Sequence, residues 1–344
     1  MSEHANESGV RSYRLRVASV VRETPDACSI VFDSPGFDYR PGQFLTLRIP
    51  SDRCGSVARC YSLSSSPHVD DTLQVTVKRT VDGYGSNWIC DSVSAGDELE
   101  ALAPAGIFTP SSLDSDLLLF AAGSGITPVI SIVKSVLATG SGRVVLVYAN
   151  RDERSVIFAA ELAALAAAHP GRLVVLHWLE SVQGLPTDAA LAALAAPYAA
   201  HDVFICGPAP FMTATRTALS TLDVPKQRVH LERFKSLGAN PFERAVAVAQ
   251  STARASTVAV TLDGERRCFD WPADTKLLDL LLARGLDAPY SCREGACSAC
   301  ACRLVAGEVK MLNNEVLEDE DIEEGIVLAC QSLPVTDEVE ISYE

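Results

Sequence analysis

The stretch Ser291-Cys292-Arg293-Glu294-Gly295-Ala296-Cys297-Ser298-Ala299-Cys300 contains three cysteines in the spacing C-x4-C-x2-C. A fourth cysteine, Cys330, follows after a gap of 29 residues. Four thiolates with this spacing can hold a [2Fe–2S] cluster, with three on one tight loop and the fourth from a separate segment. The loop is rich in small, turn-prone residues, so its backbone amides can point at sulfur. We therefore predict that Cys292, Cys297, Cys300 and Cys330 bind a [2Fe–2S] cluster.

Two other uses of these cysteines fit the sequence less well. A structural zinc site usually contains paired C-x2-C units, whereas the distant cysteine stands alone here. A disulfide set is typical of exported proteins, and the first ten residues, MSEHANESGV, lack the apolar stretch of a secretion signal. Because the other seven cysteines show no pairing pattern either, we expect a reducing cytoplasm. These seven are Cys28, Cys54, Cys60, Cys90, Cys206, Cys268 and Cys302.

The composition is that of a globular protein. The chain has 344 residues, 48% hydrophobic and 21% charged, which favours two or three domains. No uncharged apolar run is long enough for a membrane span, which requires about 18 residues. The net charge is −15, and residues 257–344 contain 19 acidic and 7 basic residues. This balance disfavours nucleic acid as a partner. It indicates either a solvated face or a docking surface for a basic protein.

The pattern of apolar residues changes along the chain. Residues 10–112 alternate short apolar runs with turns, which predicts a β-barrel or sandwich. Residues 113–238 alternate continuous apolar runs with alanine-rich helical stretches, which predicts a doubly wound α/β sheet. The first set of runs includes Ser29–Phe32, Phe44–Ile49 and Leu73–Val77. The second includes Leu117–Ala121, Val144–Tyr148, Leu173–Leu176 and Val203–Ile205, with helices over Ala159–Ala168 and Ala189–Ala196.

The C-terminal part begins after a stretch without a clear period. We expect residues 239–256 to be a linker. Residues 257–344 then start with a strand, an Asp263-Gly264 turn and a second strand. A helix is predicted over Lys276–Arg284, with Asp274 or Thr275 as its N-cap. The cluster loop follows, so this is an α+β domain.

The segment Arg59-Cys60-Tyr61-Ser62 ends a predicted strand and resembles a flavin-binding motif of the ferredoxin–NADP reductase superfamily. The resemblance implies that Arg59 binds the flavin pyrophosphate, Tyr61 packs on the isoalloxazine and Ser62 bonds flavin N5. The side chains suit these roles. A guanidinium pairs with phosphate through two parallel hydrogen bonds, an aromatic face covers a planar ring, and a short hydroxyl reaches a ring nitrogen. A surface arginine and a core tyrosine are the simpler alternative.

Further along, Gly83-Tyr84-Gly85-Ser86-Asn87-Trp88-Ile89 resembles the family's G-x-x-S-x-x-L segment, with Ile in place of Leu. In the family a helix N-terminus presents amides to the pyrophosphate here. This implies roles for Gly83 and Ser86 and favours FAD over FMN. The segment Val77-Lys78-Arg79 is similar to the strand that lines the flavin ribityl chain, although Lys78 and Arg79 could be ordinary solvated charges.

The segment Ala122-Gly123-Ser124-Gly125-Ile126-Thr127-Pro128 follows a predicted strand and opens a predicted helix. It resembles the family's nicotinamide-nucleotide turn, G-x-G-x-x-P. The family often has a further glycine at the position of Ala122. Gly123 and Gly125 permit close backbone approach to phosphate, and the resemblance implies that Thr127 binds the nucleotide with them.

A later segment, Cys206-Gly207-Pro208-Ala209-Pro210-Phe211-Met212, resembles the family's C-G-P-x-x-M segment with one extra residue before Met. The resemblance implies that Cys206 lies beside the nicotinamide during hydride transfer and that Gly207 and Pro208 bind the nucleotide. An isolated buried cysteine is the alternative. Glu232 stands in a Glu-x-Phe that resembles the end of this domain near the flavin, which implies a catalytic role with Ser62 and Cys206.

These motifs occur in the order found in the superfamily's three-domain oxygenase reductases, and the resemblance covers essentially the whole chain. It implies a β-barrel flavin domain, a doubly wound NAD domain and a β-grasp domain of the plant-type ferredoxin class. The cofactors are then FAD, NADH and a [2Fe–2S] cluster. NADH is expected because Asp152 and Glu153 suit a ribose diol, whereas Arg151 and Arg154 would suit a 2′-phosphate.

The partner implied by the resemblance is a Rieske oxygenase. The stretches Gly55–Leu63, Tyr148–Arg151 and Ser291–Cys302 are most similar to reductases that serve an oxygenase hydroxylating 3-ketosteroids at the 9α position. An oxygenase for phenylacetyl-CoA or aromatic compounds is the near alternative. A flavin–iron redox sensor is an alternative of another class, although no output domain is evident. We expect a monomer that binds neither nucleic acid nor a membrane.

Overall fold

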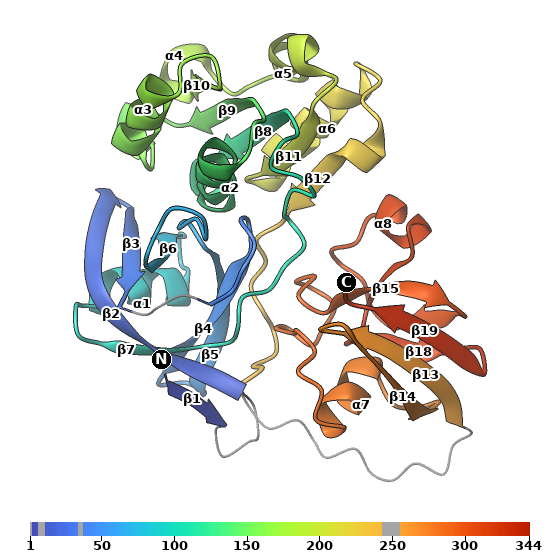
Figure 1. Ribbon diagram of the computed structural model, residues 1–344. Coiled ribbons are helices and arrows are strands. Elements are labelled where there is room, and N and C mark those ends of the chain that lie inside the picture. Colours follow the sequence, from blue (N-terminus) through green and yellow to red (C-terminus); the bar gives the residue numbers. More distant parts are fainter. Residues whose placement is uncertain (1, 6–10, 34–36, 243–254) are drawn as a thin grey trace. The chain divides into compact units, whose positions relative to one another are not determined.

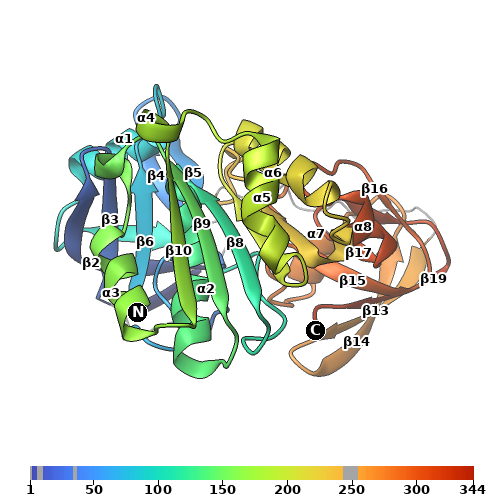
Figure 2. The ribbon, with the colours of Figure 1, turned by 90° about the horizontal axis from the view of Figure 1, so that it is seen from above.

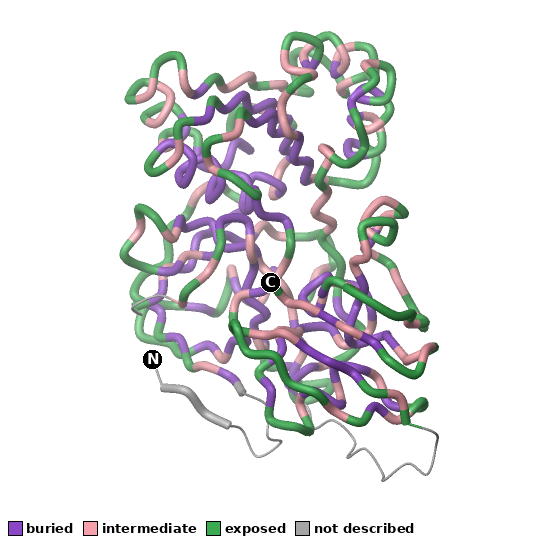
Figure 3. The backbone as a smooth tube through the Cα atoms, turned by 45° about the vertical axis from the view of Figure 1, so that its right-hand side comes forward, coloured by how far each residue is buried: buried purple, intermediate pink, exposed green. Residues whose placement is uncertain are grey.

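The computed structural model describes residues 2–5, 11–33, 37–242 and 255–344 (Figure 1). They form two compact units, the first mainly Tyr13–Pro104 and Phe108–Phe234 and the second mainly Lys235–Glu344. Buried residues, purple in Figure 3, form a core within each unit. Among the described residues, no helix is long and apolar enough to cross a membrane. Most of the predicted linker, residues 239–256, lies outside the described residues, and the predicted domain boundaries stay predictions.

The first part of unit 1 is an antiparallel barrel with the strand order β5-β4-β7-β2-β3-β6, and β1 pairs with β2. A bridge between Leu63, just after β5, and Val75 of β6 joins the two ends of this order. Alternate residues of a strand face the same side, and so Leu45, Leu47 and Ile49 of β4 all lie in the barrel core. The elements are β1 (Ser2–Ala5), β2 (Arg11–Thr24), β3 (Ala27–Phe32), β4 (Phe44–Ser51), β5 (Gly55–Ser62), β6 (Leu73–Lys78), α1 (Tyr84–Ser92) and β7 (Glu98–Ala101).

Unit 1 continues as a parallel five-stranded sheet with the order β10-β9-β8-β11-β12, and Figure 2 shows β10, β9 and β8 side by side. Leu117 and Leu119 of β8 pack with helices α2 and α3, whereas Leu118 and Phe120 pack with α5 and α6. Helices therefore cover both faces, which confirms the doubly wound prediction. The elements are β8 (Leu117–Ala122), η1 (Gly123–Gly125), α2 (Ile126–Thr139), β9 (Val144–Asn150), η2 (Glu153–Ser155), α3 (Ala159–Ala168), β10 (Leu173–Leu179), α4 (Glu180–Gln183), α5 (Asp188–Ala195), η3 (Ala196–Tyr198), β11 (Asp202–Cys206), α6 (Ala209–Ser220), η4 (Lys226–Arg228) and β12 (Val229–Glu232).

Helix α2 joins the barrel to the parallel sheet. The buried Ser131 hydroxyl donates to the carbonyl of Ser65, in the barrel, at 2.6 Å. Lys134 of the same helix forms an ion pair with Asp70, with 2.7 Å between Nζ and Oδ2. The flavin-like motif and the nucleotide turn therefore belong to one packed unit.

Unit 2 contains a mixed five-stranded sheet with the order β14-β13-β19-β15-β17 and a helix in its core. The β13–β14 hairpin turns at Asp263 and Gly264, whose φ angles are 54° and 74°. A type I′ turn requires positive φ at both residues. Leu277 and Leu281 of α7 pack around the fully buried Trp271, which gives the predicted β-grasp architecture. The elements are β13 (Ala255–Leu262), β14 (Glu265–Pro272), α7 (Leu277–Ala283), β15 (Ala301–Ala306), β16 (Val309–Met311), α8 (Asp319–Glu323), β17 (Ile326–Leu328), β18 (Ser332–Pro334) and β19 (Glu338–Ser342).

The predicted start of helix α7 is wrong by one to two residues. The N-cap is Lys276, which makes no capping hydrogen bond through its side chain. Thr275 is drawn into the core instead, because its carbonyl accepts a hydrogen bond from Trp271 Nε1 at 2.6 Å. A hydrogen bond from a side chain four residues earlier thus holds the Thr275 carbonyl, and the helix starts after Lys276.

Candidate functional site

The two flavin-like motifs meet through Gly85. A Cβ atom placed on Gly85 would lie 2.9 Å from Arg59 Cγ and 3.4 Å from the Tyr61 hydroxyl. Only a glycine lets helix α1 come so close to the end of β5. Gly85 stands within the quoted motif, but we predicted no role for it. Its place beside Arg59 and Tyr61 makes it part of the candidate flavin site.

The three polar residues of β5 differ in environment. Ser62 is buried and Tyr61 is half-buried, and burial raises the pKa of the Tyr61 hydroxyl above its usual value. The tyrosine therefore stays neutral and presents an uncharged ring. Arg59 donates from Nη1 to the carbonyl of Ala58 at 2.7 Å. A pyrophosphate would have to draw this guanidinium away from its own backbone.

Helix α1 begins at an N-terminus that could hold an anion. Its N-cap, Gly83, has no side chain with which to accept from the first amides. The Ser86 hydroxyl accepts from the Thr80 amide at 3.0 Å, which fixes the turn before the helix. A Cβ on Gly83 would lie 2.8 Å from Thr80 Cβ and 2.9 Å from Ser86 Oγ, so the turn also requires glycine. Backbone amides at such a helix start suit a phosphate.

Lys78 lies between the barrel and the nucleotide turn. Val77 before it is fully buried, whereas the Lys78 ammonium is 3.8 Å from Asp26 Oδ2. A Cβ on Gly123 would lie 3.5 Å from Lys78 Nζ. Desolvation lowers the pKa of Lys78, and the neighbouring carboxylate of Asp26 opposes this shift. An ammonium group in this position could contact a phosphate bound either at the barrel or at the nucleotide turn.

The two nucleotide motifs pack directly on each other. A Cβ on Gly125 would lie 2.0 Å from the Cys206 carbonyl oxygen, so no side chain is possible there. A Cβ on Gly207 would lie 2.9 Å from Ala122 Cβ. The Thr127 hydroxyl donates to the carbonyl of Ser124 at 3.0 Å, inside the same turn. Pro208 is the N-cap of α6, so a second helix start lies next to the turn.

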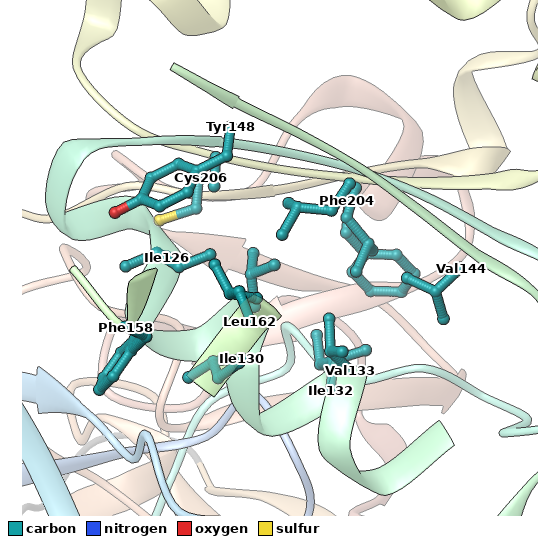
Figure 4. Close-up of a cluster of buried hydrophobic side chains, with 14 of the residues drawn as sticks. Ile126, Ile130, Ile132, Val133, Val144, Tyr148, Phe158, Leu162, Phe204 and Cys206 are labelled. Carbon is teal, nitrogen blue, oxygen red and sulfur yellow. The ribbon is translucent and has the colours of Figure 1, made fainter. Parts of the chain in front are cut away.

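Cys206 and Glu232 are brought together by the sheet. Cys206 pairs with Ala121 of β8 on one side and with Glu232 of β12 on the other. Figure 4 shows the fully buried Cys206 in a hydrophobic cluster with Tyr148 and Ile126. Desolvation raises the pKa of the Glu232 carboxyl to about 8. Desolvation and the nearby Glu232 raise the pKa of the Cys206 thiol, so it stays protonated near neutral pH.

Two residues considered for coenzyme choice are already engaged. Arg151 donates to Asp26 Oδ2 at 2.9 Å. Asp152 caps η2 and accepts from the Ser155 amide at 2.9 Å. The side chain of Asp152 is therefore held in a local cap, and the expected pairing of Asp152 and Glu153 with a ribose stays a prediction.

The four predicted cluster ligands lie together in unit 2 and are free thiols. The amide of Cys292 donates to Cys297 Sγ at 3.3 Å, and the amide of Cys330 donates to Cys300 Sγ at 3.4 Å. The thiols of Cys297 and Cys330 contact that of Cys292 and lower its pKa, with further help from two backbone amides. The sulfurs therefore form two neighbouring pairs connected through Cys292 and Cys330.

The loop backbone is shaped to donate to sulfur. The amides of Glu294 and Ala296 donate to Cys292 Sγ at 3.4 and 3.2 Å. Positive φ angles at Arg293, Gly295 and Ser298 turn the backbone inward. Such N–H···S contacts stabilise thiolates. The donor set therefore fits a group held by four cysteine sulfurs.

Among the described residues, no group of three or more His, Cys, Asp or Glu side chains has the geometry to hold a metal ion. That geometry applies to a single ion. A [2Fe–2S] cluster has four cysteine ligands shared between two irons. The pairs Cys292/Cys297 and Cys300/Cys330 provide this arrangement, whereas a tetrahedral zinc ion would need all four sulfurs around one point. Cys302 is buried in the core of unit 2 and donates to the Val327 carbonyl at 3.8 Å.

A cysteine pair in the barrel was not foreseen from the sequence. The thiols of Cys28 and Cys90 are 3.2 Å apart although 62 residues separate them. Strand β3 carries the first and helix α1 the second. No spacing pattern predicts such a pair, because it depends on how the helix packs on the strand.

Three family models match the chain. They are the oxidoreductase FAD-binding domain over residues 15–109, the oxidoreductase NAD-binding domain over residues 119–217, and the 2Fe-2S iron-sulfur cluster binding domain over residues 260–335. Their order along the chain is the predicted one. The NAD-binding match lies within unit 1 and the cluster-binding match within unit 2, whereas the FAD-binding match lies in unit 1 except for Ala105–Ile107.

Relatives and solved structures agree with this order. The chain is 59% identical over 343 residues to the ferredoxin reductase component of 3-ketosteroid-9-alpha-monooxygenase from Rhodococcus rhodochrous, covering 97% of this chain and 98% of the relative. It is 34% identical over 354 residues to a component of the 1,2-phenylacetyl-CoA epoxidase of Escherichia coli (strain K12), covering 96% and 98%. The structure of phthalate dioxygenase reductase has the same fold, with a TM-score of 0.59 at 24% identity over 98% of this chain and 99% of that one.

Proposed function

The chain belongs to the family of oxygenase reductases that includes the ferredoxin reductase component of 3-ketosteroid-9-alpha-monooxygenase, and we propose that it supplies electrons to a 3-ketosteroid 9α-hydroxylase. It is an oxidoreductase that uses NADH, FAD and a [2Fe–2S] cluster. The 59% identity to the Rhodococcus component carries the choice of oxygenase, because identity to the phenylacetyl-CoA epoxidase component is only 34%.

In the proposed function, FAD carries out the two-electron step and the cluster carries out the one-electron steps. When bound, FAD accepts the electron pair of a hydride, and the cluster passes electrons on one at a time. Arg59 and the start of α1 would bind the FAD pyrophosphate, as the contact of Gly85 with Arg59 and Tyr61 supports. Tyr61 would cover the flavin ring, and Ser62 would donate to it.

The chain's own residues would also orient the nicotinamide nucleotide. Gly123, Gly125 and Thr127 would receive its phosphates, with Gly207 and Pro208 next to them, since a Cβ on Gly125 would lie 2.8 Å from the Gly207 amide nitrogen. Cys206 and Glu232 lie at the carboxyl ends of β11 and β12. Ligands of open α/β sheets bind at such strand ends. Because the Glu232 carboxyl and the Cys206 thiol would both be protonated there, they would add no negative charge next to the site of hydride transfer.

The partner would be an oxygenase component of the Rieske type. The acidic C-terminal part, in which helix α8 over Asp319–Glu323 is almost entirely acidic, supports a basic docking face on that partner. We further propose a reducing cytoplasm, because the seven cysteines outside the ligand pattern show no pairing pattern in the sequence. We also propose a monomer.

The proposal is tested by reconstitution. The purified reductase, NADH, a 3-ketosteroid and the oxygenase component of a 3-ketosteroid 9α-hydroxylase should together form the 9α-hydroxylated steroid. Either component alone should form none. If no steroid product appears, whereas an oxygenase for phenylacetyl-CoA or aromatic compounds turns over well, the proposed partner is wrong and the reductase assignment stands. A redox sensor would reduce no oxygenase at a useful rate.

A further inference from the structure

Tyr84 is an exposed aromatic residue that is held in a fixed position. It is the first residue of helix α1 and follows the N-cap, Gly83. Its hydroxyl donates to the carbonyl of Pro50, in β4, at 2.7 Å, and 34 residues separate the two along the chain. The residue is nevertheless 45% exposed. An aromatic ring that is tied at its hydroxyl and open on its surface loses little freedom when a planar ligand stacks on it.

The register of β4 and β5 places this ring beyond the phosphate end of the proposed flavin site. Pro50 pairs with Ser56, three residues before Arg59 along β5. Because a strand rises about 3.3 Å per residue, Ser56 lies about 10 Å from Arg59 along the strand, on the side away from Tyr61. In the proposed site, the order along β5 is then the flavin ring at Tyr61, the pyrophosphate at Arg59 and the ring of Tyr84 at the hairpin end.

The residue after Tyr84 brings the start of α1 close to both strands. A Cβ on Gly85 would lie 2.9 Å from Arg59 Cγ and 2.9 Å from Ile49 Cδ1. Ile49 pairs with Val57, which is half-buried and faces the same side of β5 as Arg59, since alternate residues of a strand share a face. An apolar side chain therefore lies on β5 between the proposed pyrophosphate position and the hairpin end.

We propose that Tyr84 binds the adenine ring of FAD by stacking and thereby gives the site a preference for FAD over FMN. FAD differs from FMN by an adenosine monophosphate joined to the phosphate of FMN. With the isoalloxazine at Tyr61 and the pyrophosphate at Arg59, a dinucleotide in an extended form places its adenine further along β5, toward Tyr84. This inference rests on the flavin site proposed above.

A purely structural role is the simpler alternative, because the hydrogen bond to Pro50 joins α1 to the hairpin. Two substitutions separate the roles. Tyr84→Phe keeps the ring and removes this hydrogen bond, whereas Tyr84→Leu removes the ring as well. A structural role predicts that both substitutions weaken FAD and FMN alike. Stacking predicts a loss that is specific for FAD and that occurs mainly in Tyr84→Leu.

The experiment measures which flavin each protein retains. Each holoenzyme is dialysed against an equimolar mixture of FAD and FMN, and the bound flavins are separated by chromatography and quantified. The Kd for each flavin is measured from the fluorescence of flavin released on dilution. We expect the ratio of bound FAD to bound FMN to fall about tenfold in Tyr84→Leu, which is within the range for a base stacked on an aromatic side chain. The Kd for FMN should not change, and Tyr84→Phe should keep most of the preference for FAD.

Arg59→Ala provides the contrast, because both flavins carry a phosphate at the position proposed for Arg59. It should weaken FAD and FMN together. An unchanged ratio of FAD to FMN in Tyr84→Leu, or an equal loss of both flavins there, would overturn the inference. If Arg59→Ala weakens neither flavin, the proposed flavin site is wrong and the inference fails with it.

Discussion

Cys206 and Glu232 occupy paired positions at the carboxyl ends of two neighbouring parallel strands, β11 and β12. The pairing places a carboxyl beside a buried thiol, and desolvation raises the pKa of both groups. Neutral forms of both side chains are therefore favoured near neutral pH. If the dinucleotide binds here as proposed, neutral side chains would avoid charge repulsion with its anionic phosphates.

The stability of unit 1 should depend on pH through Glu232. Its pKa is about 8 in the folded protein, compared with 4.5 for the free side chain. A raised pKa means that the folded state holds the proton more tightly, so this contribution to stability is complete below about pH 4.5 and is lost as the pH rises through 8. Glu232→Gln is neutral at every pH and should lose less thermal stability between these limits. The measurement is the midpoint of thermal unfolding across this pH range, and parallel curves for the two proteins would argue against a raised pKa.

Arg59→Ala should weaken FAD binding. A charge-assisted hydrogen bond contributes roughly 1.5–3 kcal/mol, which corresponds to about a 10- to 100-fold higher Kd for FAD. Arg48→Ala is the matched control, because Arg48 lies on the neighbouring strand β4 and pairs with Glu100 at 2.8 Å. Flavin retention after dialysis and the Kd from fluorescence titration report the difference. Equal FAD affinity in the two variants would show that Arg59 does not bind the pyrophosphate.

Cys297→Ser should abolish the cluster and preserve the flavin. Cys297 Sγ accepts from the Cys292 amide within the ligand loop, so losing this thiolate leaves one iron short of a ligand. Cys302→Ala should keep both irons, since the Cys302 thiol contacts the Val327 carbonyl instead. Iron, acid-labile sulfide and the visible spectrum are measured for both proteins. One zinc ion per chain without sulfide in the unaltered protein would show that the site is not a cluster.

Sequence patterns predict best what depends on residues that are neighbours along the chain. The cysteine spacing is an example, because three predicted ligands share one loop and the amide of Cys292 donates to Cys297 Sγ within it. Gly125 was expected to permit close approach to a phosphate, whereas the structure shows another need for glycine there, a Cys206 carbonyl 2.0 Å from where its Cβ would be. Contacts between distant segments leave no such pattern. Gly238 and Glu294 are 56 residues apart in the sequence, yet the Glu294 carboxylate accepts a hydrogen bond from the Gly238 amide.

Two further features were not predicted from the sequence. Arg151 binds Asp26 across 125 residues, and no rule for coenzyme choice anticipates that an arginine after β9 is already paired. The N-cap of α7 is Lys276, whereas the carbonyl of Thr275, one of the two expected caps, accepts a hydrogen bond from the Trp271 side chain. The first feature depends on a contact between distant segments, and the second on a hydrogen bond across four residues that has no sequence pattern of its own.

The last prediction concerns docking of the oxygenase. Residues 257–344 carry 19 acidic and 7 basic residues, and α8 adds an acidic capping box at Glu318 and Asp321. If the partner docks by charge, the coupled rate of steroid hydroxylation should fall as salt rises, because screening shortens to about 8 Å at 0.15 M and about 3 Å at 1 M. Reduction of the enzyme's own FAD by NADH requires no encounter with a protein and serves as the control. Glu323→Lys, at an exposed position of α8, should lower the coupled rate at low salt and reduce its salt dependence, with cluster content unchanged. A coupled rate that does not respond to salt in the unaltered protein would mean that the acidic face is only a solvated surface.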